Sequence, residues 1–156
     1  MLKIVPALFV LAGISAASWA EEVTYRKDIR PLWEKKCGAC HGTNAPYYGD
    51  FMEDRKKYEA ALKGPRMDTY ADLIFYVGWP DSGALMRRLD DGKNADNGKP
   101  GNMYKYLGTT AEEREKNLAL FKEWVGKDAW NLNRWEARGK APAITKEQMD
   151  KIKVKY

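Results

Sequence analysis

The feature that most constrains this 156-residue chain is the position of its rarest reactive side chains. It has two cysteines and one histidine, and all three lie within the five residues Cys37-Gly38-Ala39-Cys40-His41. Zinc fingers, disulfide frameworks and multi-histidine metal sites need more ligands than these three side chains provide. A catalytic Ser-His-Asp or Cys-His site would also have to use His41. The cysteine and histidine chemistry of the chain is therefore confined to residues 37–41.

The spacing C-x-x-C-H is typical of covalent attachment of a c-type haem. Two thiols separated by two residues can add to the two vinyl groups on one porphyrin edge, and the next residue, a histidine, then falls beneath the iron. A redox-active disulfide is the alternative, but that class of protein has a βαβ context, and this chain lacks strand-like alternation. The motif predicts one haem c, held by Cys37 and Cys40, with His41 as an iron ligand.

Residues 1–20 have the pattern of a secretory signal peptide. Lys3 is followed by a mostly apolar run, the small residues Ser18 and Ala20 precede a cleavage position, and Glu21 is charged. A retained anchor is the alternative, but the apolar run is short for a bilayer span, which needs about 20 residues. No other stretch is long and apolar enough to cross a membrane. We therefore expect cleavage after Ala20 and a soluble protein of the periplasm, which agrees with attachment of haem c after export.

The rest of the sequence predicts an all-α single domain over residues 21–156. The clearest helix follows the capping box Thr110–Glu113, has Leu118, Phe121 and Trp124 at helical spacing, and ends at Gly126. The other expected helices are 25–36, 51–63 capped by Asp50, 69–77 capped by Asp68, 83–89 capped by Ser82, 129–138 capped by Asp128, and a terminal helix from the capping box Thr145–Gln148 to about Val154. Composition makes residues 90–102 a loop and 139–144 a linker.

Two stretches resemble class I monohaem cytochromes c of bacteria. YRKDIRPLWEKKCGACHG, from Tyr25 to Gly42, resembles the helix that leads into their haem motif. GNMYKYLGTTAEEREKNLALFKEWVG, from Gly101 to Gly126, resembles their methionine loop and final core helix. The resemblance implies short helices wrapped around one haem, a His/Met-ligated iron and no catalysis, with residues 127–156 as a helical extension.

The second iron ligand has several candidates. A second histidine is unavailable within one chain, which leaves a methionine, a lysine, a tyrosine or an open position. Met103 lies in a Gly- and Pro-containing loop eight residues before Ala111, where the resemblance places the ligand. Met67, two residues after Pro65, is the alternative, whereas Met86 is typical of a core position and Met52 of a first helical turn. We predict His41 and Met103 as the iron ligands.

These features predict a periplasmic electron carrier rather than an enzyme. Its partners would be a redox donor and a redox acceptor, and we expect a monomer. The charge of +5, from 27 Lys and Arg against 22 Asp and Glu, is too small to indicate nucleic-acid binding. Two other functions stay open. One is a haem-bearing subunit of a larger redox complex, held by residues 127–156. The other is a haem protein whose open sixth position binds or senses a ligand.

Overall fold

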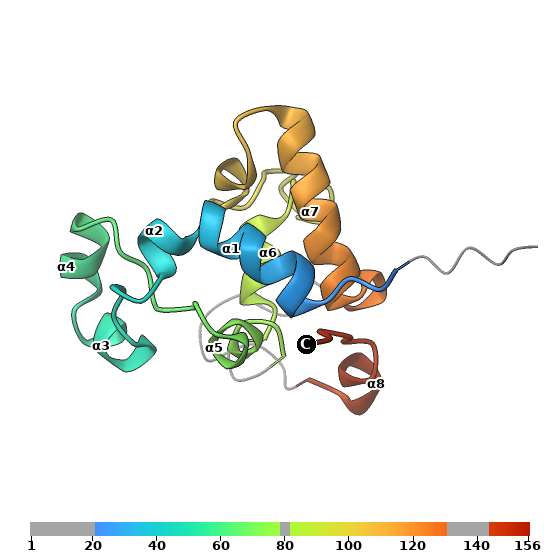
Figure 1. The fold of residues 1–156 in the computed structure, drawn as a ribbon, viewed down its shortest axis with the longest axis horizontal. Coiled ribbons are helices and arrows are strands. Elements are labelled where there is room, and N and C mark those ends of the chain that lie inside the picture. Colours follow the sequence, from blue (N-terminus) through green and yellow to red (C-terminus); the bar gives the residue numbers. More distant parts are fainter. Residues whose placement is uncertain (1–20, 79–81, 131–143) are drawn as a thin grey trace, which may run out of the picture.

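The fold was analysed in a computed structural model that describes residues 21–78, 82–130 and 144–156 (Figure 1). Every regular element in these residues is a helix, which confirms the all-α prediction. The elements are η1 (Tyr25–Ile29), α1 (Arg30–Lys36), α2 (Gly38–His41), α3 (Tyr48–Glu53), α4 (Arg55–Ala60), α5 (Tyr70–Phe75), α6 (Ala84–Leu89), η2 (Tyr104–Leu107), α7 (Ala111–Val125), η3 (Lys127–Ala129) and α8 (Lys146–Met149). The predicted signal peptide, residues 1–20, lies outside the described residues and remains a prediction.

The expected helix over 25–36 forms in two parts. Thr24 caps the π-helical turn η1 by accepting a hydrogen bond from the backbone N–H of Lys27. Pro31 then stands in the first turn of α1. Because proline has no backbone N–H, it cannot donate an α-helical hydrogen bond, and it is tolerated at the start of a helix. The π-helical turn before it and the α-helix after it together carry the chain to Cys37.

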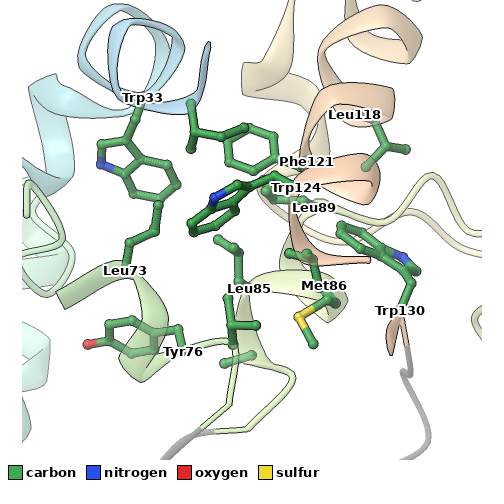
Figure 2. Packing of buried hydrophobic residues seen from close by; sticks show 14 of the residues in the cluster. Trp33, Leu73, Tyr76, Leu85, Met86, Leu89, Leu118, Phe121, Trp124 and Trp130 are labelled. Carbon is green, nitrogen blue, oxygen red and sulfur yellow. The ribbon is translucent and has the colours of Figure 1, made fainter. Parts of the chain in front are cut away.

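The hydrophobic core lies between α1, α5, α6 and α7 (Figure 2). Its most buried side chains include Ile29, Leu73, Phe121 and Trp124, each at most 1% exposed. The predicted apolar face of α7 thus packs inward. The helices α3 and α4 lie apart from α7, beside α2 (Figure 1). They contribute one buried side chain, Phe51, and it lies outside the core cluster.

The predicted helix over 51–63 is wrong in its extent and its cap. The chain forms α3 and α4 instead, separated by Asp54, whose φ of −136° and ψ of 61° are not helical. The Asp54 side chain accepts a hydrogen bond of 3.2 Å from the backbone N–H of Lys57. Asp54 therefore caps the second helix, and Asp50 lies inside the first one.

Two other predicted caps lie next to the observed ones. Thr69, rather than Asp68, caps α5, and the Asp68 carboxylate is paired with the Arg66 guanidinium. Gly83 precedes α6 with a left-handed φ of +79°, a conformation that favours glycine. The neighbouring Ser82 hydroxyl instead donates to a carbonyl of the preceding turn. Both helices form where they were expected. Each begins one residue later than predicted, α5 ends at Phe75 instead of 77, and α6 ends at Leu89 as predicted.

The longest helix, α7, has 15 residues and begins as the capping box predicted. Thr110 accepts a hydrogen bond of 3.1 Å from the Glu113 N–H. The reciprocal bond differs, because the Glu113 carboxylate accepts from the N–H of Thr109, at 2.7 Å, rather than from that of Thr110. Gly126 ends the helix with a φ of +102°. Among the described residues, no helix is long and apolar enough to cross a bilayer.

Only part of the predicted extension falls within the described residues. Lys127–Ala129 form the 3-10 turn η3 and Trp130 is not helical, so the predicted helix does not begin at 129. The rest of that prediction, 131–138, and most of the linker lie outside the described residues. The capping box Thr145–Gln148 is confirmed, but α8 ends at Met149 rather than near Val154.

The last residues return to the core instead of extending the helix. The Val154 N–H donates to the Trp124 carbonyl at 2.8 Å, and the Tyr25 N–H donates to the Lys155 carbonyl at 2.8 Å. The Trp124 indole N–H also donates to the Lys155 carbonyl, at 2.9 Å. Residues 153–156 therefore join the end of α7 to the start of η1, where Figure 1 places the C-terminus.

Candidate haem attachment site

The predicted attachment residues lie on one helical turn. The Cys37 N–H donates to the Trp33 carbonyl at 2.8 Å, and the Cys40 and His41 N–H groups donate to the Cys37 carbonyl at 3.1 and 2.9 Å. These bonds place Cys40 and His41 three and four residues after Cys37 on the same turn, the spacing at which helical side chains are neighbours. Cys37 ends α1 and begins α2, so α1 leads the chain directly into the motif.

The surroundings of Cys37 differ from those of a reactive dithiol. Burial first, and then the neighbouring Cys40, raise the pKa of the Cys37 thiol to about 12. Cysteines of redox-active C-x-x-C proteins have pKa values lowered below the ordinary range, because the thiolate is the reactive form. The environment of Cys37 is therefore opposite to that of a dithiol oxidoreductase.

The imidazole of His41 is buried and held by main-chain atoms. The ring Nδ1 lies 2.7 Å from the Pro65 carbonyl oxygen, and since a carbonyl can only accept, Nδ1 carries the proton and donates. Gly64 lies directly against the ring, because a Cβ at that position would overlap Cε1 and stand 2.7 Å from Nδ1. The pKa of His41 is lowered by burial, so the ring is neutral at pH 7. Its other nitrogen, Nε2, keeps a lone pair for a metal ion.

Residues 64–67 form the wall behind His41. The Gly64 N–H donates to the Cys40 carbonyl at 3.0 Å, and the Met67 N–H donates to the His41 carbonyl at 2.9 Å. With the Pro65 carbonyl on Nδ1, this segment is fastened to the motif at three places. Met67, the alternative ligand, therefore belongs to the segment that supports the histidine.

Met103 is placed on a separate loop, at the start of η2. Its N–H donates to the Arg88 carbonyl at 2.9 Å, and its side chain is partly buried against the core cluster. The structure thus brings Cys37, Cys40 and His41 together and keeps Met103 on another segment bordering the same core. Of the remaining candidates, Met86 is a core residue at 2% exposure, as predicted, and Met149 is 45% exposed on α8.

These residues fit a haem better than a directly bound metal ion. No group of three or more His, Cys, Asp or Glu in the described part of the chain could hold a metal alone. The two cysteines can form the thioether bonds of a covalent haem, and the neutral imidazole, backed by Gly64, can bind its iron. Trp33 Nε1, four residues before Cys37, is buried and has no hydrogen-bond partner in the described residues, so the polypeptide leaves a donor unused beside the motif.

Two parts of this site were not predicted from the sequence. A Gly-Pro pair such as Gly64-Pro65 is typical of any turn, and nothing local marks it as the support of a histidine. Asp90, at the end of α6, was counted as part of a loop, yet it is 1% exposed. The residues that follow it, Asp91 to Asn94, give no sign of burial, because they are polar residues and a glycine.

Comparison with known proteins supports this assignment. Residues 24–156 match the family described as PccH cytochrome c. The chain is also similar to the solved structure of the monoheme cytochrome PccH from Geobacter sulfurreducens, with 55% sequence identity and a TM-score of 0.77. That match covers 87% of this chain and 100% of the other. A search of curated proteins found no match. Because the similarity extends through the C-x-x-C-H motif and the region beyond α7, the chain belongs to the PccH family of monohaem c-type cytochromes, which carry electrons through one covalent haem c and are not enzymes.

Proposed function

We propose that this chain carries single electrons between two redox proteins of the periplasm, with His41 and Met103 as the iron ligands. The haem supplies the one-electron step between Fe(III) and Fe(II). The chain supplies the attachment, the two ligands and the surface on which partners dock. The observation that carries this proposal is the His41 imidazole, buried and oriented by Pro65 with Nε2 left for iron.

The orientation of His41 supports a ligand role over that of an ordinary core histidine. Histidines that bind metals donate their other ring N–H to a carbonyl or a carboxylate, which fixes both the tautomer and the ring plane. Here the Pro65 carbonyl provides that contact, and Gly64 allows the backbone to approach the ring. A core histidine needs a hydrogen-bond partner, but it does not need its second nitrogen kept free.

The position of Met67 favours Met103 as the second ligand. Axial ligands approach the iron from opposite sides of the porphyrin. Met67 follows Pro65 by two residues, and its N–H is bonded to the His41 carbonyl, so it belongs to the histidine side. Met103 comes from the η2 loop, which is joined to α6 and α7 rather than to residues 64–67. A methionine thioether is neutral and soft, and as an axial ligand it raises the reduction potential.

Electron carriage also accounts for the C-terminal residues better than a role as a subunit held by an arm. Residues 153–156 are hydrogen-bonded to Tyr25, Arg26, Trp124 and Val125 of the same chain. They are therefore occupied within the monomer. Cleavage after Ala20 would remove Lys3 and reduce the net charge from +5 to +4, which would give only modest steering toward acidic partners. The sequence pattern of residues 1–20 supports export to the periplasm.

One experiment tests location, cofactor and ligands together. The full-length gene is expressed in bacteria that mature c-type haem, and the protein is purified from the periplasmic fraction. We expect a mass equal to the chain from Glu21 plus one haem. The oxidised protein should show the weak far-red band of an Fe(III)–thioether bond. Replacing Met103 by Ala should remove that band and allow the reduced iron to bind carbon monoxide.

Met67→Ala and Met149→Ala are the matched controls, and both should keep the far-red band. If Met67→Ala removes the band and Met103→Ala does not, the ligand assignment is wrong and the carrier proposal stands. A wild-type protein that lacks the band and binds carbon monoxide directly would instead support an open sixth position. Recovery of the haem protein only in the cytoplasm would contradict export.

A further inference from the structure

Asp90 is the most buried carboxylate among the described residues, and the proposed function does not use it. It follows α6 and is 1% exposed. One carboxylate oxygen accepts from the Trp130 indole N–H and from the Asn94 side-chain amide, each at 2.8 Å. The other accepts from the backbone N–H groups of Gly92 and Asn94, at 2.9 and 3.2 Å. The carboxylate therefore joins three parts of the chain.

The contacts of Asp90 are those of a structural anchor rather than of a cation site. Four N–H groups point at its two oxygens, which leaves little lone-pair capacity for a metal ion. The Lys122 ammonium lies 3.9 Å from it and 5.5 Å above the Trp130 ring, and thus covers the group from α7. Burial acts to raise the pKa of Asp90, but the hydrogen bonds from Asn94 and Trp130 outweigh it, and the net pKa is lowered. Asp90 is ionised at neutral pH.

The backbone around Asp90 holds the Met103 loop. The Gly101 N–H donates to the Asp90 carbonyl, and the Met103 N–H donates to the Arg88 carbonyl, each at 2.9 Å. Gly101 permits this approach, because a Cβ there would collide with the carbonyls of Arg87 and Arg88. The position of Met103 is therefore set by the end of α6, and Asp90 fixes that end.

The far side of the loop is anchored independently. The buried side chain of Asn117, on α7, donates to the Leu107 carbonyl at 2.6 Å. With η2 held there, the loop from Gly101 to Leu107 has one anchor on α7 and one on α6. Loss of the α6 anchor would let the Met103 end move while the η2 end stays attached.

We propose that Asp90 is a positioning residue for Met103, and that Trp130 completes this role from the segment after α7. The inference rests on the proposed ligation of iron by Met103. Trp130 lies after the stretch that resembles a class I cytochrome c, and the proposal assigns it a role in haem ligation. Through the hydrogen bond between Trp130 and Asp90, this residue keeps the methionine on the iron.

The rate at which added imidazole binds to the oxidised holoprotein measures how often the methionine leaves the iron. Asp90→Asn keeps the shape of the side chain but turns an amide toward N–H donors. We expect it to speed imidazole binding by about tenfold, the factor that corresponds to one lost buried hydrogen bond. Trp130→Phe removes one N–H and retains an aromatic ring, and it should speed binding by about threefold or more. The far-red band should weaken in both variants.

Two controls separate positioning from charge and from overall stability. Asp91→Asn makes the same change in charge one residue away, at a carboxylate that accepts from the Lys93 N–H and, like Asp90, lies 3.9 Å from the Lys122 ammonium. Ile29→Val weakens the core without touching the loop. Both should bind imidazole at the wild-type rate within about twofold. Denaturant unfolding of every variant, followed by far-UV dichroism, records the loss of global stability.

The proposal is overturned if Trp130→Phe and Asp90→Asn bind imidazole at the wild-type rate. It is also overturned if Ile29→Val, at an equal loss of global stability, speeds imidazole binding as much as the Asp90 and Trp130 variants do. If Asp90→Asn does not fold, Trp130→Phe alone decides. Met103→Ala identifies the source of a failure. If Met103→Ala keeps the far-red band, the ligand assignment is wrong. If Met103→Ala loses the band but the Asp90 and Trp130 variants bind imidazole at the wild-type rate, only the positioning role is wrong.

Discussion

At the scale of single residues, the orientation of His41 depends on two backbone features rather than on side chains. The Pro65 carbonyl accepts from Nδ1 across a separation of 24 residues, and Gly64 provides the flat surface against the ring. The C-x-x-C-H motif is predictable because its chemistry depends on local spacing. The residues that hold the His41 ring, Gly64 and Pro65, lie more than 20 residues away in the sequence, so the local spacing of the motif does not predict them.

Gly64→Ala tests that support. The new Cβ would overlap Cε1 of His41, so the ring must tilt or the 64–67 segment must move. Overpacking of this kind costs about 1–3 kcal/mol, and here it acts directly on an iron ligand. We expect a lower free energy of unfolding and a shifted Soret band in the holoprotein, both measured against wild type.

Gly49→Ala is the matched control for that change. A Cβ at Gly49 would meet no atom within 4 Å, and the residue lies within α3, where alanine is the better helix former. Its Soret band should stay at the wild-type position and its stability should be equal or higher. An unchanged Soret band and stability in Gly64→Ala would show that the glycine is not needed against the ring.

At the scale of elements, the sequence predicted where most helices form but often missed the residue that begins them. Adjacent candidates such as Asp68 and Thr69 have similar capping ability, so local preference cannot separate them. A specific side-chain pairing decides, because Asp68 is paired with Arg66, two residues before it, and Thr69 is left to cap α5. The Thr110 and Thr145 caps were predictable because each threonine is followed three residues later by Glu or Gln, which is the sequence of a capping box.

One ion pair connects the attachment segment with the start of α7. Lys36, directly before Cys37, is paired with Glu113, whose carboxylate also accepts from the Thr109 N–H. The hydrogen bond from Lys36 is the largest cause that lowers the pKa of Glu113 from 4.5 to about 2. Because the folded-state pKa is depressed, the pair stabilises the fold above pH 4.5, and this contribution is lost as the pH falls toward 2.

Glu113→Gln should therefore lower the melting temperature at pH 7, and the difference from wild type should shrink between pH 4.5 and pH 2. Thermal unfolding of both proteins across this range, followed by circular dichroism, measures the difference. Glu112→Gln is the control, since Glu112 is an exposed carboxylate in the same first turn of α7. A difference between Glu113→Gln and wild type that stays constant down to pH 2 would contradict the role of the ion pair.

At the scale of the whole molecule, the core and the segment between His41 and Gly64 differ in how much apolar packing supports them. The core between α1, α5, α6 and α7 contains side chains with no exposed area, among them Ile29, Leu73 and Phe121. By contrast, α4 has no buried residue and α3 has only Phe51. Segments with few buried apolar side chains open at low free-energy cost.

Residues 38–67 should therefore depend on the haem for their order more than α7 does. In a Cys37→Ala/Cys40→Ala protein, which cannot attach haem, we expect the amides of Gly64 and Met67 to exchange with solvent hydrogen at least about tenfold faster than in the holoprotein. Those amides are bonded to the carbonyls of Cys40 and His41, so their exchange reports separation of the wall from the motif. The amides of Phe121 and Trp124, inside the core helix, serve as the internal control, and their exchange should speed up less. If exchange speeds up equally at Gly64, Met67 and the two α7 amides, the haem stabilises the fold as one cooperative unit. If the Gly64 and Met67 amides stay protected without haem, the polypeptide alone fixes the position of the histidine.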